Sequence, residues 1–280
     1  MSKFYKFLKD YFSSFAKHYS LKTKIGEGGY GDVYLVKQRA DRTTLAAKIV
    51  KKQEITQWVV TKAGVKLPSE VWLLSTLSHT NIIEFYGYHK LSTRWVLLLN
   101  YNVHYSDLFT VVQEYGALSE ASSKTIIHQL YNVINYCFTQ DVDHRDIKAE
   151  NILVNTTTLH IKLIDFGSAT FCKMDTPYTE GRGTSLFLPP EHHSQSFYYP
   201  NEAAVWSLGC LTYFMLLGDV PFHTDEEIVY CEFEGFNYAF LAMSKKCQLF
   251  ITQCLEKSRE ERLKWSEVKN HLWLWRLSTV

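Results

Sequence analysis

The chain has 280 residues, of which 46% are hydrophobic and 15% aromatic, and its formal net charge is +1. This composition can build a sizeable core and excludes a disordered chain, and the length suits one large domain or two small ones. A net charge so close to zero gives no reason to expect binding to nucleic acid or to an anionic membrane surface.

The sequence also argues against membrane insertion and secretion. Its most apolar stretch, 203–217, is interrupted by Ser207, Gly209 and Thr212 and is too short to cross a bilayer, so we expect a buried core helix there. Lysines at positions 3, 6, 9 and 17 break up the apolar block that a secretory signal peptide needs. The six cysteines form no CxxC pair, which is typical of reduced, mostly buried thiols in the cytoplasm or the nucleus.

Residues 1–18 are predicted to form an amphipathic helical extension. Apolar side chains recur there at helical spacing, and the charged ones lie mostly elsewhere on the helix. Such a helix can bind a membrane surface or a partner, or it can pack on the domain that follows. We favour packing, because no linker rich in Gly, Pro or Ser separates this segment from the rest of the chain.

A glycine-rich turn follows between two predicted strands. Gly26, Gly28 and Gly31 have the GxGxxG spacing, and glycines let backbone amides approach phosphate groups. The motif alone is weak evidence, because dinucleotide-binding folds also contain it. In those folds a helix follows directly, whereas 33–36 continues here as a strand. The pattern therefore favours a hairpin that covers phosphates.

Lys48 is the basic residue inside the next predicted strand, 44–50. A lone lysine in a strand is usually a solvated edge residue, but two alanines precede this one at the spacing of a phosphate-binding strand lysine. Such a lysine needs a carboxylate partner on the following helix. Glu70 is the candidate, in a helix predicted over 70–77 with Pro68 near its start.

Strands are expected at 81–83 and 95–99, and after Asn100 the pattern changes to helices, expected at 106–114, 119–138 and 202–217. We therefore divide the chain into the extension 1–18, a strand-rich part 19–102 and a helical part 103–280.

Two polar runs in the helical part carry the chemistry. The run 144–153 contains Asp146, Lys148 and Asn151, and the second run, 163–167, contains Asp165. Phosphoryl transfer needs one carboxylate to orient a hydroxyl, a lysine to neutralise the moving group, and an asparagine and a second carboxylate to hold Mg²⁺. Ordinary turn and cap residues could produce either run alone. Such residues do not explain both runs in this order after the glycine-rich turn and the strand lysine.

Together these motifs resemble a eukaryotic protein kinase over residues 20–275. The resemblance implies an α+β, two-lobed protein-kinase fold, with an antiparallel sheet and one helix in the N-lobe and a mainly helical C-lobe. A lysine at the position of Lys148 in the first run is typical of serine/threonine kinases. Further segments resemble the Pim kinases, namely 55–58, 67–71, 163–168, 189–191, 203–209, 218–222 and 225–228.

The resemblance implies a role for each site residue. Asp146 is the catalytic base, Lys148 stabilises the transferred charge, and Asn151 and Asp165 bind Mg²⁺. The residues implied in ATP binding are Ile25, Gly26, Gly28, Gly31, Val33, Ala46, Lys48, Glu70, Leu99, Asn100 and Asn102. Thr184 is expected to hydrogen-bond near Asp146, and Arg262 to pair with Glu191.

The chain also departs from the family pattern. Most kinases have an aspartate where Ala204 stands, which braces the catalytic loop from the core helix; Pim kinases also lack it. Asn102 replaces the Pim hinge proline and so restores a backbone donor. Phe214 stands where kinases that prefer basic substrates often carry an acid.

Four acids are expected to line a groove for basic substrate residues: Asp107, Glu150, Asp219 and Asp225. Each of them singly is more simply a solvated acid at a loop or helix end. As a set, they predict a preference for Arg or Lys before the target Ser or Thr, since arginine pairs bidentately with carboxylates.

The leading hypothesis is thus an ATP- and Mg²⁺-dependent serine/threonine kinase that acts on proteins as a monomer, without nucleic acid or a transmembrane segment, in the cytoplasm or the nucleus. The alternative is a Pim-like pseudokinase or scaffold that acts by binding. Against it, Lys48, Glu70, Asp146, Asn151 and Asp165 are all present. A small-molecule phosphotransferase is a third class, and the 189–191 segment with its Arg262 partner opposes it.

Overall fold

The computed structural model describes residues 14–28, 31–231, 233 and 238–275. The chain divides into two compact units. Unit 1 comprises 1–78 and 83–103, and unit 2 comprises 79–82 and 104–280. The expected helix over 1–18 falls largely outside the described residues, and its last turn is α2 (Ser14–His18).

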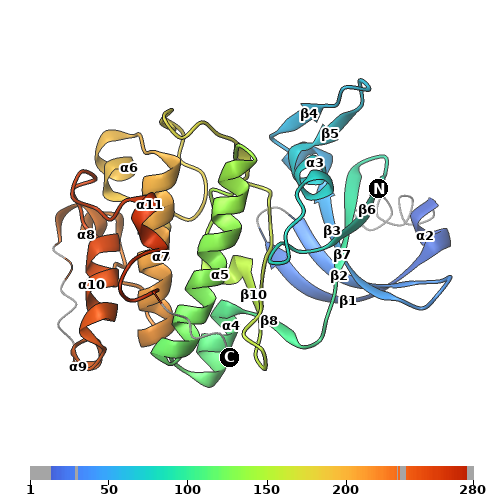
Figure 1. The fold of residues 1–280 in the computed structure, drawn as a ribbon. Helices are drawn as coiled ribbons and strands as arrows, with labels where there is room; N and C mark the ends of the chain where they lie inside the picture. The colour runs from blue at the N-terminus through green and yellow to red at the C-terminus, as the bar shows by residue number, and fades with distance from the viewer. Residues whose placement is uncertain (1–13, 29–30, 232, 234–237, 276–280) are drawn as a thin grey trace. The chain divides into compact units, whose positions relative to one another are not determined.

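Unit 1 is built on a five-stranded sheet in which all neighbouring strands are antiparallel (Figure 1). In spatial order its strands are β1 (Tyr19–Gly28), β2 (Gly31–Gln38), β3 (Thr44–Lys51), β7 (Arg94–Asn100) and β6 (Phe85–Lys90). The remaining elements are η1 (Lys52–Glu54), the hairpin β4 (Trp58–Val60) and β5 (Lys66–Pro68), and α3 (Ser69–Thr76). Pro68 caps α3 at its N-terminus, as the sequence predicts.

The two faces of this sheet have different partners. Phe15 of α2 is 3% exposed and packs in one cluster with Val36, Leu45, Ala47 and other residues of a single sheet face. Side chains two residues apart in a strand share a face, so Ala46 and Lys48 project from the opposite face. The described end of the N-terminal extension therefore packs on the domain, which leaves the other face for the candidate nucleotide residues.

Unit 2 is mainly helical and contains two small sheets (Figure 1). Its helices are α4 (Leu108–Tyr115), α5 (Glu120–Thr139), α6 (Pro190–Gln195), α7 (Pro200–Leu217), α8 (Asp225–Tyr230), α9 (Tyr238–Leu241), α10 (Lys245–Cys254) and α11 (Trp265–Val268). Its strands are β8 (Tyr105–Asp107), β10 (Ile152–Asn155) and β11 (Ile161–Leu163) in one sheet, and β9 (Val142–Asp143) and β12 (Thr170–Phe171) in the other. Short 3₁₀ helices are η2 (Ala149–Asn151) and η3 (Ser185–Phe187).

Helix α7 is the core of unit 2, because nearly all its residues are buried and it packs against α5, α10 and α11. This confirms the buried core helix expected over 203–217. Beside it, Arg262 donates to both carboxylate oxygens of Glu191 at 2.8 Å, and these side chains are 1% and 4% exposed. A bidentate pair of this kind fixes α6 against the C-terminal part of the unit.

One predicted strand is wrong. Residues 81–83 form no strand: Ile82 makes only an isolated bridge to Leu163, and the strand lies further on, at Phe85–Lys90. The cause is Asn81, whose side-chain amide is buried and donates to Gln129 Oε1 and to the Ile161 backbone carbonyl. These bonds attach the segment to unit 2 instead of the sheet.

The cysteines agree with the sequence analysis: all six are free thiols, and only Cys231 is exposed. Within the described part of the chain, no helix combines the length and apolar character needed to cross a bilayer.

Gly31 and Gly26 provide a matched pair of substitutions in the β1–β2 hairpin. Gly31 has φ +140°, and a Cβ added there would lie 2.5 Å from the Ile49 backbone oxygen. At Gly26 an added Cβ would meet only Val33, at 3.5 Å. We expect Gly31→Ala to lower the free energy of unfolding by about 1–3 kcal/mol and Gly26→Ala by much less. Urea denaturation measures both, and equal losses would contradict this account of Gly31.

Candidate active site

The catalytic-loop candidate, 144–151, connects the two small sheets of unit 2. It leaves β9, which pairs with β12, and enters β10, which pairs with both β11 and β8. Both ends of the loop are thus fixed by backbone pairing. Its polar side chains are consequently presented from a short, doubly anchored segment.

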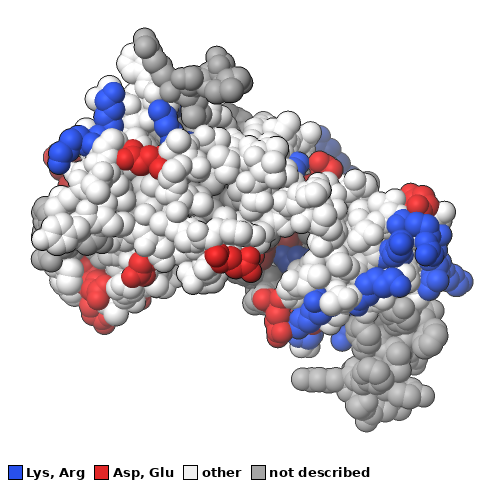
Figure 2. Space-filling model, turned by 90° about the horizontal axis from the view of Figure 1, so that it is seen from below, with Lys and Arg blue, Asp and Glu red and all other residues white. Residues whose placement is uncertain are grey.

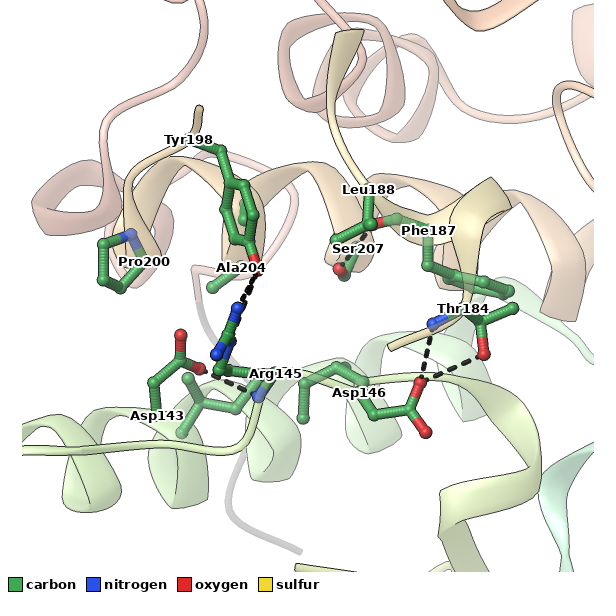
Figure 3. Close-up of a pocket in the computed structure, with 13 residues that line it drawn as sticks. Asp143, Arg145, Asp146, Thr184, Phe187, Leu188, Tyr198, Pro200, Ala204 and Ser207 are labelled. Atoms are coloured by element: carbon green, nitrogen blue, oxygen red, sulfur yellow. Dashed lines mark hydrogen bonds between the residues drawn. The ribbon is translucent and has the colours of Figure 1, made fainter. Parts of the chain in front are cut away.

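Asp146 is the centre of a hydrogen-bond network, although it is only 7% exposed. Its Oδ1 accepts bonds from both the backbone N–H and the Oγ1 of Thr184, each at 3.0 Å (Figure 3). Its Oδ2 accepts from Asn151 Nδ2 at 2.9 Å and lies 3.3 Å from Lys148 Nζ. Lys148 Nζ also donates to Thr184 Oγ1 at 2.7 Å. The structure thus brings four of the predicted site residues together.

This geometry suits a carboxylate that orients a hydroxyl group and takes its proton. The Asp146 carboxylate accepts bonds from uncharged donors and lies beside Lys148, so its orientation is fixed on both oxygens. Lys148 is half-buried and close enough to Asp146 to place a positive charge beside a group transferred there.

The second acid, Asp165, follows β11 and is tied to the catalytic loop. The Ile164 N–H donates to the Asn151 carbonyl, and His144 Nε2 lies 2.9 Å from the Ile164 carbonyl. Asp165 has φ +60°, in the left-handed region, and its Oδ1 accepts the Gly167 N–H. Such strained backbone conformations persist where the surroundings enforce them, often at functional sites.

The donor set of Asn151 and Asp165 fits Mg²⁺. The Asn151 amide nitrogen donates to the Asp146 backbone carbonyl and to its carboxylate, so the amide oxygen is directed away from Asp146. Among the described residues no cluster of three or more His, Cys, Asp or Glu could hold a metal. One carboxylate and one amide are nevertheless the usual protein share of a Mg²⁺ site that is completed by phosphates and water.

Unit 1 contributes the candidate nucleotide residues. Lys48 Nζ donates to Glu70 Oε1 at 2.6 Å, and both side chains are buried, which confirms the expected contact between them. Lys48 lies opposite Val33 on β2, and Ala46 lies opposite Leu99 on β7, so these four share one face of the sheet. At the end of β7, Asn100 Nδ2 donates to Glu84 Oε2. Asn102 is exposed.

The four predicted substrate acids lie in different local settings. Asp107 caps α4 and accepts two bonds from Thr110, and Asp225 accepts from Ser185 Oγ at 2.8 Å. Asp219 accepts its neighbour's backbone N–H, and Glu150 is exposed. Phe214 is buried and stacks on Phe109 with ring centroids 5.8 Å apart. The shared groove therefore stays a prediction.

Two residues of the site were missed in the sequence. Tyr198 accepts a bond from Arg145 Nη2 at 2.8 Å, and Asp143, 7% exposed, accepts the Arg145 N–H. Burial raises the pKa of Asp143 to about 6, while the bond from Arg145 opposes the rise. An acid directly before the first run, on a buried strand, was the available signal for Asp143.

These features define a protein kinase. One unit has a β-strand lysine paired with a helix glutamate, and the helical unit has a catalytic-loop aspartate whose carboxylate is hydrogen-bonded on both oxygens. Comparison with known sequences agrees, since the protein kinase domain model matches residues 19–274.

The chain belongs to the protein kinase family, and it is an ATP-dependent serine/threonine kinase. It is 33% identical to the serine/threonine-protein kinase pim-2 of Danio rerio over 270 residues, which is 93% of this chain and 86% of the fish protein. It is 31% identical to the serine/threonine-protein kinase prk-2 of Caenorhabditis elegans over 264 residues, or 94% of this chain and 59% of the worm protein. An Aurora kinase of Saccharomyces cerevisiae is 28% identical over 260 residues. The predicted resemblance to Pim kinases is confirmed.

We expect Lys48→Met and Asp165→Asn each to abolish phosphotransfer. The first removes the cation that positions the phosphates, and the second removes a Mg²⁺ ligand. Lys48→Met also leaves Glu70 buried without its cation, so Lys48→Met with Glu70→Gln is the matched variant that avoids an unpaired charge. Turnover of a peptide with Mg-ATP measures the loss of phosphotransfer, and circular dichroism checks that each variant is folded. Near wild-type turnover in either single variant would show that the assigned roles are wrong.

Proposed function

We propose that the chain is a catalytically active kinase that transfers the γ-phosphate of ATP to Ser or Thr of protein substrates. The observation that carries this proposal is the Asp146 network, in which Thr184, Asn151 and Lys148 hold the carboxylate. A scaffold that acts only by binding has no need to retain these groups together. The same completeness weighs against the pseudokinase alternative.

In this proposal each unit has its own task. The glycines of the β1–β2 hairpin approach the phosphates through their backbone, and Lys48, oriented by Glu70, neutralises them. Asn151 and Asp165 hold Mg²⁺, which neutralises charge on the phosphates when it is bound. Asp146 orients the substrate hydroxyl and accepts its proton, and Lys148 stabilises charge on the group in transfer.

The direct experiment is incubation of the purified chain with Mg-ATP and a degenerate peptide library that carries Ser or Thr at one fixed position. Phosphate incorporation that depends on Mg²⁺ and is lost in Asp146→Asn supports an active kinase. ATP binding without incorporation would instead favour a pseudokinase.

We also propose a preference for basic residues before the target site. The support is charge: Asp107, Glu150, Asp219 and Asp225 all belong to unit 2 and are at least partly exposed. On the face drawn in Figure 2, acidic side chains are spread over unit 2, whereas the densest group of Lys and Arg lies over unit 1. Each partly exposed pair with a substrate arginine should contribute on the order of 1 kcal/mol, roughly fivefold in specificity.

Asp107 allows the sharpest test of this preference, because it also caps α4. Asp107→Asn keeps the capping oxygen and removes the charge, whereas Asp107→Ala removes both. We expect wild type to prefer a basic peptide over its alanine-substituted form, and Asp107→Asn to reduce the ratio of kcat/KM values by roughly fivefold. Equal kcat/KM for the two peptides with wild type would contradict the proposal.

We further propose that activity needs no phosphate on the activation segment, residues 168–188. In kinases the arginine before the catalytic aspartate often binds such a phosphate. Here the Arg145 guanidinium lies 4.0 Å from the Tyr178 ring centroid and donates to the Tyr198 hydroxyl and the Glu180 carbonyl. Tyr178 and Tyr198 also exchange two backbone hydrogen bonds, at 2.8 and 3.1 Å. The segment is therefore attached to Arg145 by uncharged partners.

This proposal predicts that complete dephosphorylation leaves turnover nearly unchanged. The phosphate acceptors in the segment include Thr176, Tyr178, Thr179, Thr184 and Ser185. Phosphatase treatment, confirmed by intact mass, should preserve at least about half of the initial rate, whereas Tyr178→Leu should lower it because it removes the ring that contacts Arg145. Loss of activity on dephosphorylation would contradict the proposal.

The proposed location is the cytoplasm or the nucleus, and the proposed state is monomeric. The six free cysteines support a reducing compartment. Burial raises the pKa of Cys137 and Cys172 to about 12, so neither thiol is a reactive thiolate at neutral pH.

A further inference from the structure

The face of α7 beside the catalytic loop has no carboxylate. The α7 residues that line a small cavity behind the loop are Pro200, Ala203, Ala204 and Ser207. The polar one, Ser207, donates its hydroxyl to the Phe187 carbonyl at 3.1 Å. Ala204 stands where most kinases have the aspartate that braces this loop. A different group must therefore hold the loop backbone in this chain.

The cavity has a volume of about 20 Å³, and Asp143, Arg145 and Asp146 line its opposite side (Figure 3). Ala204 and Asp143 thus face the same small space, one from the core helix and one from the strand that leads into the loop. A space of this size holds about one water molecule.

Arg145 is the residue of the loop that needs a brace. Its φ of +62° lies in the left-handed region, which costs a non-glycine residue on the order of 1 kcal/mol. Its backbone N–H donates to Asp143 Oδ1 at 3.1 Å, and the next residue along the chain is the catalytic Asp146. A change in the peptide at Arg145 would consequently move Asp146.

We propose that Asp143 is a positioning residue that braces the catalytic loop from within, in place of the carboxylate that most kinases supply from the core helix. The proposal rests on the proposed kinase activity. Asp143 acts through Arg145 on Asp146, and it contacts neither ATP nor the substrate.

A local turn that only stabilises the fold is the simpler interpretation, and the setting of Asp143 opposes it. Asp143 is 7% exposed, and burial raises its pKa to about 6, so this site disfavours the charged form of the carboxyl group. The bond that it accepts comes from the residue directly before Asp146, at a wall of the cavity that Ala204 also lines. Groups whose pKa is perturbed by burial and a specific partner are concentrated at functional sites.

The test moves the carboxylate from one side of the cavity to the other. Four variants of the full chain are compared with wild type: Asp143→Leu, Asp143→Asn, Asp143→Leu with Ala204→Asp, and the exposed control Asp141→Asn. For each one, kcat, the KM values for ATP and peptide, thermal unfolding, and hydrogen exchange of a peptide that contains Arg145 are measured.

We expect Asp143→Leu to lower kcat by about tenfold or more with both KM values within about threefold, because positioning is lost while binding is kept. Asp143→Asn, which retains an acceptor oxygen, and the double variant should each recover kcat to within about threefold of wild type. Faster exchange at Arg145 should appear in Asp143→Leu and return to normal in the double variant. Asp141→Asn should match wild type.

Wild-type kcat in a folded Asp143→Leu variant overturns the proposal, and so does a folded double variant that stays slow. If Asp143→Leu does not fold, the double variant decides: folding with wild-type kcat supports the brace, and folding without activity rejects it. A wild-type protein that transfers no phosphate rejects the kinase proposal instead. The exchange data then decide on the brace, because protection of Arg145 does not depend on turnover.

Discussion

The Asp146 carboxylate must be held in one orientation, and much of unit 2 serves this constraint. Its donors come from two places far apart in the sequence, Asn151 and Lys148 in the loop itself and Thr184 in the activation segment. A carboxylate bonded on both oxygens has little freedom to rotate, so a hydroxyl that enters beside it meets an oriented acceptor. The activation segment is therefore part of the catalytic geometry.

The framework around this carboxylate is made by buried contacts. Helix α7 provides an apolar core, and the Arg262–Glu191 pair fixes α6, directly after the activation segment, against the C-terminal part of unit 2. Removing one partner of such a buried pair typically costs 3–5 kcal/mol, because the other charge stays behind uncompensated. Arg145 extends the framework through Tyr178 of the activation segment and through Tyr198, which follows α6. Uncharged groups therefore contact the arginine side chain that a phosphate often binds in other kinases.

The sequence allowed the fold to be predicted because the spacing of its motifs is characteristic. The helix at Glu120–Thr139 could be inferred from a local pattern, and the Lys48–Glu70 contact from the spacing of a kinase strand lysine and its helix partner. The error at 81–83 arose because the bonds of Asn81 reach residues 48 and 80 positions away, which no local pattern records. Asp143 was missed for a similar reason. The sequence shows that an alanine, Ala204, replaces the aspartate of most kinases, but only the fold shows that Asp143 accepts the Arg145 N–H.

The central claim, that Asp146 works because its neighbours hold it, is tested most directly at Thr184. Thr184→Ser keeps the hydroxyl that donates to Asp146, while Thr184→Val keeps the shape and removes it. Single-turnover phosphotransfer rates with Mg-ATP and a saturating peptide separate this step from product release. The account predicts a rate for Thr184→Ser within about threefold of wild type and a loss of about tenfold or more for Thr184→Val. Equal rates for the valine variant and wild type, with both proteins folded, would contradict it.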